Sequence, residues 1–132
     1  MIFLARRGGN DPVPLKEVAD ATGISRKYLE QIVSSLTAAQ LVRSNRGSSG
    51  GYRLTKSAAN ISMLDILTAT EGSLAPVDYL DELSEEPSPG EARFEVFVWR
   101  ELHDLINNYL GSVSLQDIID RSSQLEIDSY SI

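Results

Sequence analysis

The chain has 132 residues, enough for one ordinary domain or for a small domain with one additional element. It contains no cysteine, which excludes disulfides, thiolate nucleophiles and metal or iron–sulfur sites held by cysteine. The formal net charge of −7, taken alone, argues against a polyanionic partner. The sequence has neither the ~20 consecutive apolar residues of a membrane span nor a signal-peptide layout. We therefore expect a cytoplasmic protein that does not cross a membrane.

The charges are distributed unevenly along the chain. Residues 1–56 contain nine Lys or Arg and four Asp or Glu, a balance of +5, whereas the remaining residues contain three and 15, a balance of −12. A basic half followed by an acidic half indicates that the first meets a polyanion and the second meets protein or solvent. A nucleic acid therefore remains a candidate partner.

Apolar spacing and turn residues predict three helices in the first part of the chain. Residues 1–7 (MIFLARR) have the composition of the last turns of a helix and are followed by two glycines. From Leu15 the spacing predicts a short amphipathic helix that ends at Gly23. Ser25 then caps the third and longer helix.

The helix after Ser25 has two distinct faces. Its apolar face, which we expect in the core, comprises Leu29, Ile32, Val33 and Leu36. The opposite face comprises Lys27, Gln31 and Ser34, flanked by Tyr28 and Glu30. The polar face is therefore free to contact a partner.

A glycine-tipped hairpin is predicted next. Residues 41–46 (LVRSNR) alternate as a strand does, residues 47–51 (GSSGG) form a loop, and residues 52–54 (YRL) return. Glycines at this loop permit positive φ and a close approach of the backbone to a partner. Ser62 with Asp65 resembles a capping box that opens a further helix ending at Gly72.

The second half of the chain contains a long helix with a wide apolar arc. Residues 73–90 are acidic, contain prolines and lack periodicity, so we expect a linker or loop there. From residue 91 to residue 110 the apolar positions cover roughly 220° of a helical wheel, more than one neighbouring surface can cover. We expect this helix to pack on its own subunit and on a second copy. The predicted dimerisation residues are Phe94, Phe97, Val98, Trp99, Leu102, Leu105, Ile106 and Tyr109.

The order of these elements predicts the fold. A short helix, a glycine turn, a second helix and a glycine-tipped hairpin form a winged helix-turn-helix. The predicted class is mainly α, with a two-stranded β wing and a long C-terminal dimerisation helix. We expect a DNA-binding domain at residues 1–72, an acidic linker at residues 73–90, and at residues 91–132 the dimerisation helix, a short helix (LQDIID) opened by Ser114 and Asp117, and a flexible tail (DSYSI).

In this fold the helix after Ser25 fits the ~12 Å major groove of duplex DNA, and the wing reaches the backbone or the minor groove. Cations on both elements would neutralise phosphates, and hydroxyl and amide groups would bond to phosphates or base edges. Glu30 can accept a hydrogen bond from a cytosine amino group, and Arg46 suits a narrow minor groove. The residues predicted on this basis are Ser25, Arg26, Lys27, Tyr28, Glu30, Gln31, Arg43, Arg46 and Arg53.

Two stretches of the chain carry a family resemblance. They are ISRKYLEQIVSSLTAAQLVRSNRGSSGGYRL, from Ile24, and ISMLDILTATEGSLAPVD, from Ile61. The chain resembles the bacterial Rrf-two family of winged helix-turn-helix transcriptional regulators, which includes iron–sulfur-cluster, nitric-oxide-sensing and cysteine-metabolism regulators. The likeness extends over nearly the whole chain, and the motifs YLEQ and RGxxGGY are specific to it. It also places Met1 inside the family's first helix.

The resemblance implies roles for particular residues. Glu30 would read a base, and Arg46 with Ser48 and Ser49 would enter the minor groove. Ser25 and Tyr28 would help to position the recognition helix. Ser48, Ser49 and Tyr52 thereby join the predicted DNA-binding residues.

The chain departs from the cluster-binding members of that family. Those members hold their cluster with cysteines between the fourth helix and the long helix, and this chain has none. His103, the single histidine, has no second soft ligand beside it in the sequence, so we expect a surface or interface histidine and no metal or cofactor. The cluster-free cysteine-metabolism repressors are more similar, in their APVD linker and C-terminal isoleucine.

That similarity implies a homodimeric repressor in sulfur or cysteine metabolism. The cluster-free relatives are controlled through a complex with cysteine synthase, which a free carboxylate at Ile132 would reach by insertion into an amino-acid site. An idle tail is the alternative for these last residues.

Two other functions fit the sequence less well. An enzyme needs an acid–base pair or a nucleophile in a cleft, whereas the candidate acids lie in one loop without helical spacing, as a solvated charge run does. They are Asp78, Asp81, Glu82, Glu85 and Glu86. The glycine loop lacks the Gly-Lys-Ser/Thr of a phosphate-binding loop. A protein-interaction module that retains the fold without binding DNA stays open as the second function.

Overall fold

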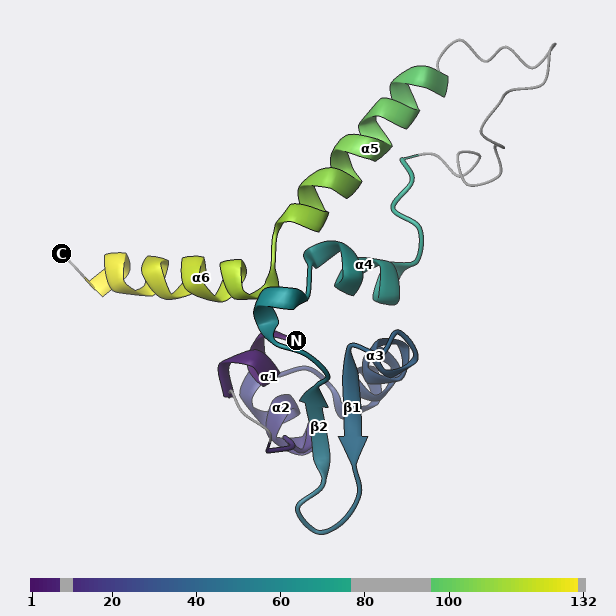
Figure 1. The fold of residues 1–132 in the computed structure, drawn as a ribbon. Helices are drawn as coiled ribbons and strands as arrows, with labels where there is room; N and C mark the ends of the chain where they lie inside the picture. The colour runs from purple at the N-terminus through teal and green to yellow at the C-terminus, as the bar shows by residue number, and fades with distance from the viewer. Residues whose placement is uncertain (8–10, 77–95, 131–132) are drawn as a thin grey trace.

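The computed structural model describes residues 1–7, 11–76 and 96–130, which form a mainly helical structure with a two-stranded antiparallel sheet (Figure 1). The elements in chain order are α1 (Ile2–Arg7), α2 (Leu15–Thr22), α3 (Arg26–Ala38), β1 (Val42–Asn45), β2 (Gly51–Leu54), the 3₁₀ turn η1 (Ala58–Asn60), α4 (Met63–Glu71), α5 (Val96–Ser112) and α6 (Leu115–Tyr130). The predicted winged helix-turn-helix order is confirmed. Sequence analysis did not predict η1.

The helix ends are set by capping residues. Gly23 ends α2 in the left-handed conformation, at φ +71°, and its N–H donates to the Ala19 carbonyl. The Ser25 hydroxyl accepts a hydrogen bond from the Tyr28 N–H at 3.2 Å and begins α3. At the start of α4, Ser62 and Asp65 form a reciprocal capping box with both bonds at 3.0 Å. These three predicted boundaries are confirmed.

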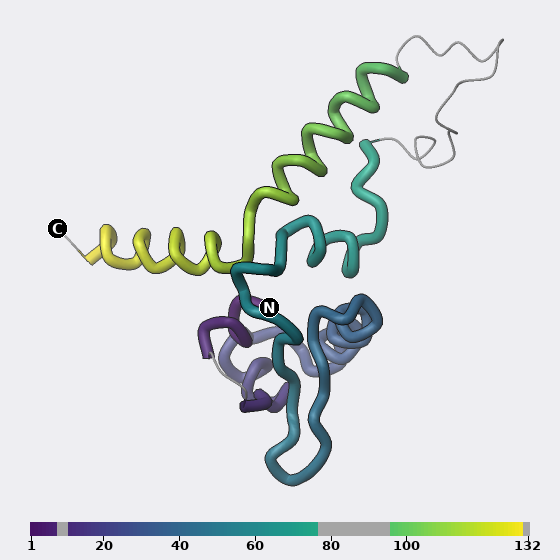
Figure 2. The backbone as a smooth tube through the Cα atoms, viewed as in Figure 1, coloured from purple at the N-terminus to yellow at the C-terminus, as the bar shows by residue number. Residues whose placement is uncertain are grey.

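The hairpin is held against the body of the molecule by a third extended segment. In the antiparallel register of β1 and β2, Val42 lies opposite Leu54 and Arg43 lies opposite Arg53. Because Val42 is buried and paired residues share a face, the pair Val42–Leu54 faces the core. Tyr52 and Val13 exchange two backbone hydrogen bonds of 2.8 and 2.9 Å. A Cβ on Gly51 would lie 2.3 Å from the Val13 carbonyl carbon, so glycine at that position permits this close approach. The tip of the hairpin projects beyond these contacts (Figure 2).

The core brings together residues distant in the sequence. Leu36, Leu41, Val42, Ile61 and Leu115 form one buried cluster. Its last member is the first residue of α6, and its N–H donates to the Ile61 carbonyl at 2.8 Å. The start of α6 is therefore part of the same core as the winged helix.

The final helix is longer than predicted. Sequence analysis expected a short helix followed by a flexible tail, but α6 has 16 residues and reaches Tyr130, so this prediction is wrong up to that residue. The stretch lacks glycine and proline, and Arg6 of α1 pairs with Glu126 at 3.3 Å. Both features favour continuation of the helix.

Helices α5 and α6 extend away from the winged helix at one end of the molecule (Figure 1). In Figure 1, α5 rises beside α4, α6 extends to one side, and the hairpin tip projects at the opposite end. None of the described helices is long and apolar enough to span a membrane. The predicted linker from residue 77 onward and Phe94 lie outside the described residues.

Candidate nucleic-acid interface

Helix α3 presents its predicted polar face to solvent. Leu29, Val33 and Leu36 are buried, and Ile32 is half-buried. The exposed side chains of its N-terminal half are Arg26, Lys27, Tyr28, Glu30 and Gln31. The predicted division of this helix into a core face and a free face is confirmed.

The first turn of α3 has an unusual charge for a helix N-terminus. The partial positive charge at that end of a helix favours acidic side chains, and α2, α4 and α6 each have an acid there. In α3 the first turn contains no acid, and Arg26 and Lys27 occupy its first two positions. Two cations there oppose the helix dipole, whereas a polyanion bound at this end would offset the repulsion.

One of these two cations has a carboxylate partner. The Arg26 Nε lies 3.5 Å from Glu30 Oε1, one helical turn further along, and both side chains are more than half exposed. Within residues 1–7, 11–76 and 96–130, Lys27 makes no ion pair. The two neighbouring cations therefore differ in their surroundings.

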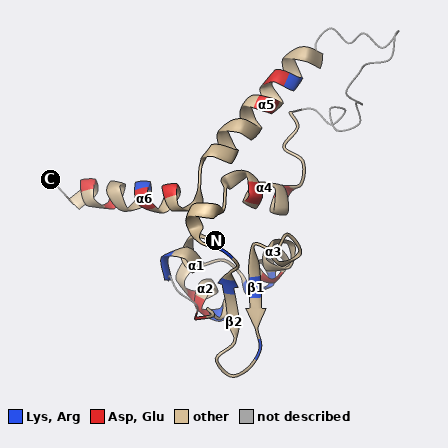
Figure 3. Ribbon diagram, viewed as in Figure 1, with Lys and Arg blue, Asp and Glu red and all other residues tan. Residues whose placement is uncertain are grey.

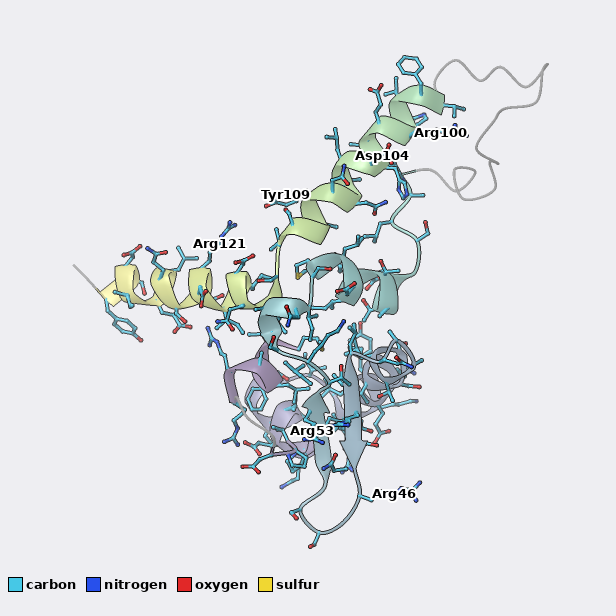
Figure 4. The ribbon with its side chains drawn as sticks, viewed as in Figure 1. Arg46, Arg53, Arg100, Asp104, Tyr109 and Arg121 are labelled. Carbon is cyan, nitrogen blue, oxygen red and sulfur yellow. The ribbon has the colours of Figure 1, made fainter. Side chains whose placement is uncertain are left out.

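The wing places a second group of polar side chains on the surface. Arg43, Arg46, Ser48 and Ser49 are exposed, and Arg46 projects outward next to the tip (Figure 4). Gly47 turns the chain at φ +120°, a conformation that favours glycine. The charged residues of the hairpin are all cationic, whereas those of α6 are mostly acidic (Figure 3).

Tyr52 and Arg53 lie deeper than the other predicted residues. Tyr52 packs against the core cluster, and its backbone pairs with Val13. Arg53 is half-buried and lines a cavity of about 380 Å³ together with Asp11 and Lys56. Tyr52 and Arg53 therefore help to hold the hairpin in place and are less accessible to a ligand than the exposed residues of the wing.

A groove between α3 and the hairpin extends the surface beyond the predicted residues. It has a volume of about 450 Å³, and its lining includes Glu30, Ser34, Thr37, Ser44 and Tyr52. Sequence analysis did not assign Thr37 or Ser44 to the site. Strand alternation gave the face of Ser44, but not which helix lies beside that face. We call α3, the hairpin and this groove between them the recognition surface.

The residues present do not fit an iron–sulfur cluster or a comparable metal site. The 132 residues contain no cysteine and one histidine. The His103 ring nitrogen Nε2 lies 2.9 Å from Asn107 Nδ2 within α5. In the part of the chain that the structure describes, no three acidic or histidine side chains gather as metal ligands do. The acids considered as catalytic candidates lie outside that part.

The comparison with protein families identifies the chain. The model of the Rrf2 (Rrf-two) family, described as an iron-dependent transcriptional regulator, matches residues 1–121. The chain belongs to the Rrf2 family of transcriptional regulators. CymR of Bacillus subtilis (strain 168) is 38% identical over 118 residues, which are 89% of this chain and 80% of that protein. IscR of Xenorhabdus nematophila is 34% identical over 128 residues, which are 96% and 76%.

The solved structures place the fold in the same group. The structure of CymR, the global cysteine regulator of B. subtilis, matches this Rrf2 chain with a TM-score of 0.70 and 34% identity, over 91% of this chain and 87% of that one. The relatives are HTH-type transcriptional regulators, not enzymes. This Rrf2 protein is accordingly a DNA-binding regulator with a winged helix and not an enzyme, as the sequence predicts.

Proposed function

We propose that this Rrf2 protein is a sequence-specific repressor that binds duplex DNA as a homodimer, in the cytoplasm, without an iron–sulfur cluster. The observation that carries the proposal is the first turn of α3, where two exposed cations oppose the helix dipole, and the hairpin adds the exposed Arg46. This arrangement favours a phosphate backbone as ligand. Helix α3 would enter the major groove and the hairpin tip the adjacent minor groove.

An exposed apolar stripe on α5 supports the homodimer. Its members are spaced by four, three and four residues, which is the spacing of a coiled-coil seam: Val98, Leu102, Leu105 and Tyr109. All four are exposed, and Tyr109 projects from α5 in Figure 4. Phe97 is exposed as well, about 80° from the edge of the stripe at 100° per residue.

Two other predicted dimerisation residues are less exposed than the stripe. Trp99 and Ile106 are half-buried and lie about 60° and 40° beyond the Leu102 edge of the stripe at 100° per residue, and α5 packs on α4. The apolar arc is therefore partly covered by the chain itself, and the stripe is what a second copy would cover. To reach consecutive major grooves, a two-fold dimer needs its two α3 helices about 34 Å apart, one turn of DNA.

The lack of cysteine supports a cluster-free mode of regulation. Without thiolates, the chain has no ligands of the type that hold iron–sulfur clusters, so we infer another effector. The likeness to the global cysteine regulator of B. subtilis supports promoters of cysteine or sulfur metabolism as targets. We also propose cysteine synthase as a partner through Ile132, which lies outside the described residues; co-purification with and without that residue tests it.

The proposed function is tested by selecting duplexes from a random-sequence library and measuring their binding by fluorescence anisotropy. We expect an enriched sequence with two-fold symmetry. Its affinity should fall by ~10³ or more between 50 and 200 mM salt if about six phosphates are neutralised, and Arg46→Ala should weaken binding. A shuffled duplex is the control. No enrichment, or binding insensitive to salt, would support the protein-interaction module instead.

A further inference from the structure

The pair formed by Arg26 and Glu30 is poorly suited to a purely stabilising role. Its Nε–Oε1 distance of 3.5 Å is long, and both side chains are more than half exposed, so solvent screens the attraction. Its order along the helix, base before acid, is the less favourable one for residues four apart. The guanidinium also lies at the helix end that repels cations. Stability therefore gives little reason for this pair at this position.

DNA binding explains the pairing of Arg26 with Glu30, because a carboxylate is repelled by the phosphates of DNA. A carboxylate can accept a hydrogen bond from the amino group of cytosine in the major groove, but the phosphates on both sides of the groove repel it. A guanidinium beside the carboxylate offsets that repulsion. Arg26 is the cation that the structure places next to Glu30.

Arginine suits this task better than lysine would. Its planar group has five N–H donors in a fixed fork, so one edge can face the carboxylate while another faces a phosphate oxygen. When a phosphate fixes the second edge in the complex, the guanidinium can hold the carboxylate in one direction at the base edge. The neighbouring Lys27 has the same charge and is also exposed, but it has no carboxylate partner among residues 1–7, 11–76 and 96–130.

We infer that Arg26 is a positioning residue for base recognition: it directs the Glu30 carboxylate toward its base pair while contacting the DNA backbone. This inference rests on the proposed function. Arg26 and Lys27 both contribute phosphate contacts, but only Arg26 affects which base pair is preferred. The preference at the position read by Glu30 is thus a property of the pair.

The test compares matched variants on the duplex enriched by the wild-type protein. For each single base-pair change we would measure the ratio of Kd values and the slope of log affinity against log salt. Glu30→Ala should lower the discrimination at one base pair about tenfold. Arg26→Ala should lower discrimination at that same base pair at least about threefold, and should reduce the salt slope by about one.

Two further variants separate positioning from charge. Lys27→Ala should reduce the salt slope by the same amount and weaken all duplexes equally, with discrimination unchanged. Arg26→Lys keeps the charge and loses the fork, so it should restore the slope and not the discrimination. In the double variant lacking both Arg26 and Glu30, discrimination should equal that of Glu30→Ala alone, because the two residues act as one unit. Circular dichroism and thermal midpoints would confirm that each variant is folded.

The outcomes distinguish the inference from the function on which it rests. If Arg26→Ala weakens every duplex equally, as Lys27→Ala does, Arg26 is only a phosphate contact and the inference is wrong while the proposed function stands. If Glu30→Ala leaves all base preferences intact, the inference is wrong because Glu30 does not read a base. If the wild-type protein enriches no sequence, both the function and the inference fail.

Discussion

The winged helix and the two C-terminal helices differ in how far the chain covers its own apolar surface. Most of the buried cluster comes from residues 36–61, which pack around the hairpin. In α5 and α6 the only buried residues described are Val96 and Leu115, while large apolar side chains of both helices remain exposed. Apart from Leu115 at the start of α6, the first region supplies its own core. The second has the composition of a surface that a further molecule completes.

The charges differ in the same sense. The winged helix presents cations at the start of α3 and at the hairpin, and α6 contains four acids and one arginine. A comparison of the two regions therefore separates the surface that we propose binds DNA from the surface that we propose binds a second copy. The expected results below begin with the largest effect.

The largest effect should come from truncating a leucine at one end of α6. Leu115 is 1% exposed and Leu125 is 70% exposed, on the same helix. Leu115→Ala should lower the free energy of unfolding by about 2–5 kcal/mol, because it leaves a cavity in the core. Leu125→Ala is the matched control and should change it little. Urea unfolding followed by circular dichroism measures both, and equal losses would show that the two ends of α6 do not differ as described.

The next effect concerns the apolar stripe of α5. Leu105→Glu places a charge at the centre of the proposed seam, and burial of an unpaired charge is costly. We expect the dimer to dissociate at least about tenfold more readily, with DNA affinity falling in parallel. Asn108→Glu adds the same charge on α5 outside the stripe and should leave both unchanged. Sedimentation velocity measures the dimer, and a Leu105→Glu protein that stays dimeric would place the interface elsewhere.

A smaller effect is expected from overpacking the hairpin. Gly51→Ala adds a Cβ that meets the Val13 backbone at 2.3 to 2.4 Å, so β2 or the segment at residues 11–13 must move. We expect a loss of about 1–3 kcal/mol in the free energy of unfolding. Ser49→Ala, at the exposed tip, is the comparison and should have no effect on stability. Unchanged hydrogen exchange at the Tyr52 N–H in Gly51→Ala would argue against the pairing with Val13.

The smallest effect should be confined to acid pH. Hydrogen bonds from the Ser114 backbone and then its hydroxyl lower the pKa of Asp117 from 3.8, with a further contribution from Arg121. A carboxyl whose pKa is lowered in the folded state contributes stability above its unfolded value and loses it as the pH falls through the folded value. Asp117→Asn should therefore be less stable than wild type at pH 7, and the difference should shrink below pH 4. Thermal midpoints across this range measure it.

The sequence predicted the parts of the site that depend on neighbouring residues. The N-cap at Ser25, the turn at Gly23 and the two faces of α3 follow from interactions within a few residues, so they can be recognised without the fold. Arg43 and Arg53 show where such reasoning stops. They are paired in register and share a face of the hairpin, yet Arg43 is exposed and Arg53 half-buried. The difference arises because α1 lies against β2, a contact between distant parts of the chain.

The sequence by itself determined the order of elements, their caps and the basic character of the recognition surface, since periodicity, capping and charge are local properties. Only the tertiary structure decided that Leu115 joins the core of the winged helix and that the wide apolar arc of α5 divides into a covered side and an exposed stripe. A helical wheel shows which residues share a face. What covers that face depends on contacts between segments far apart in the chain, and these are fixed when the chain folds.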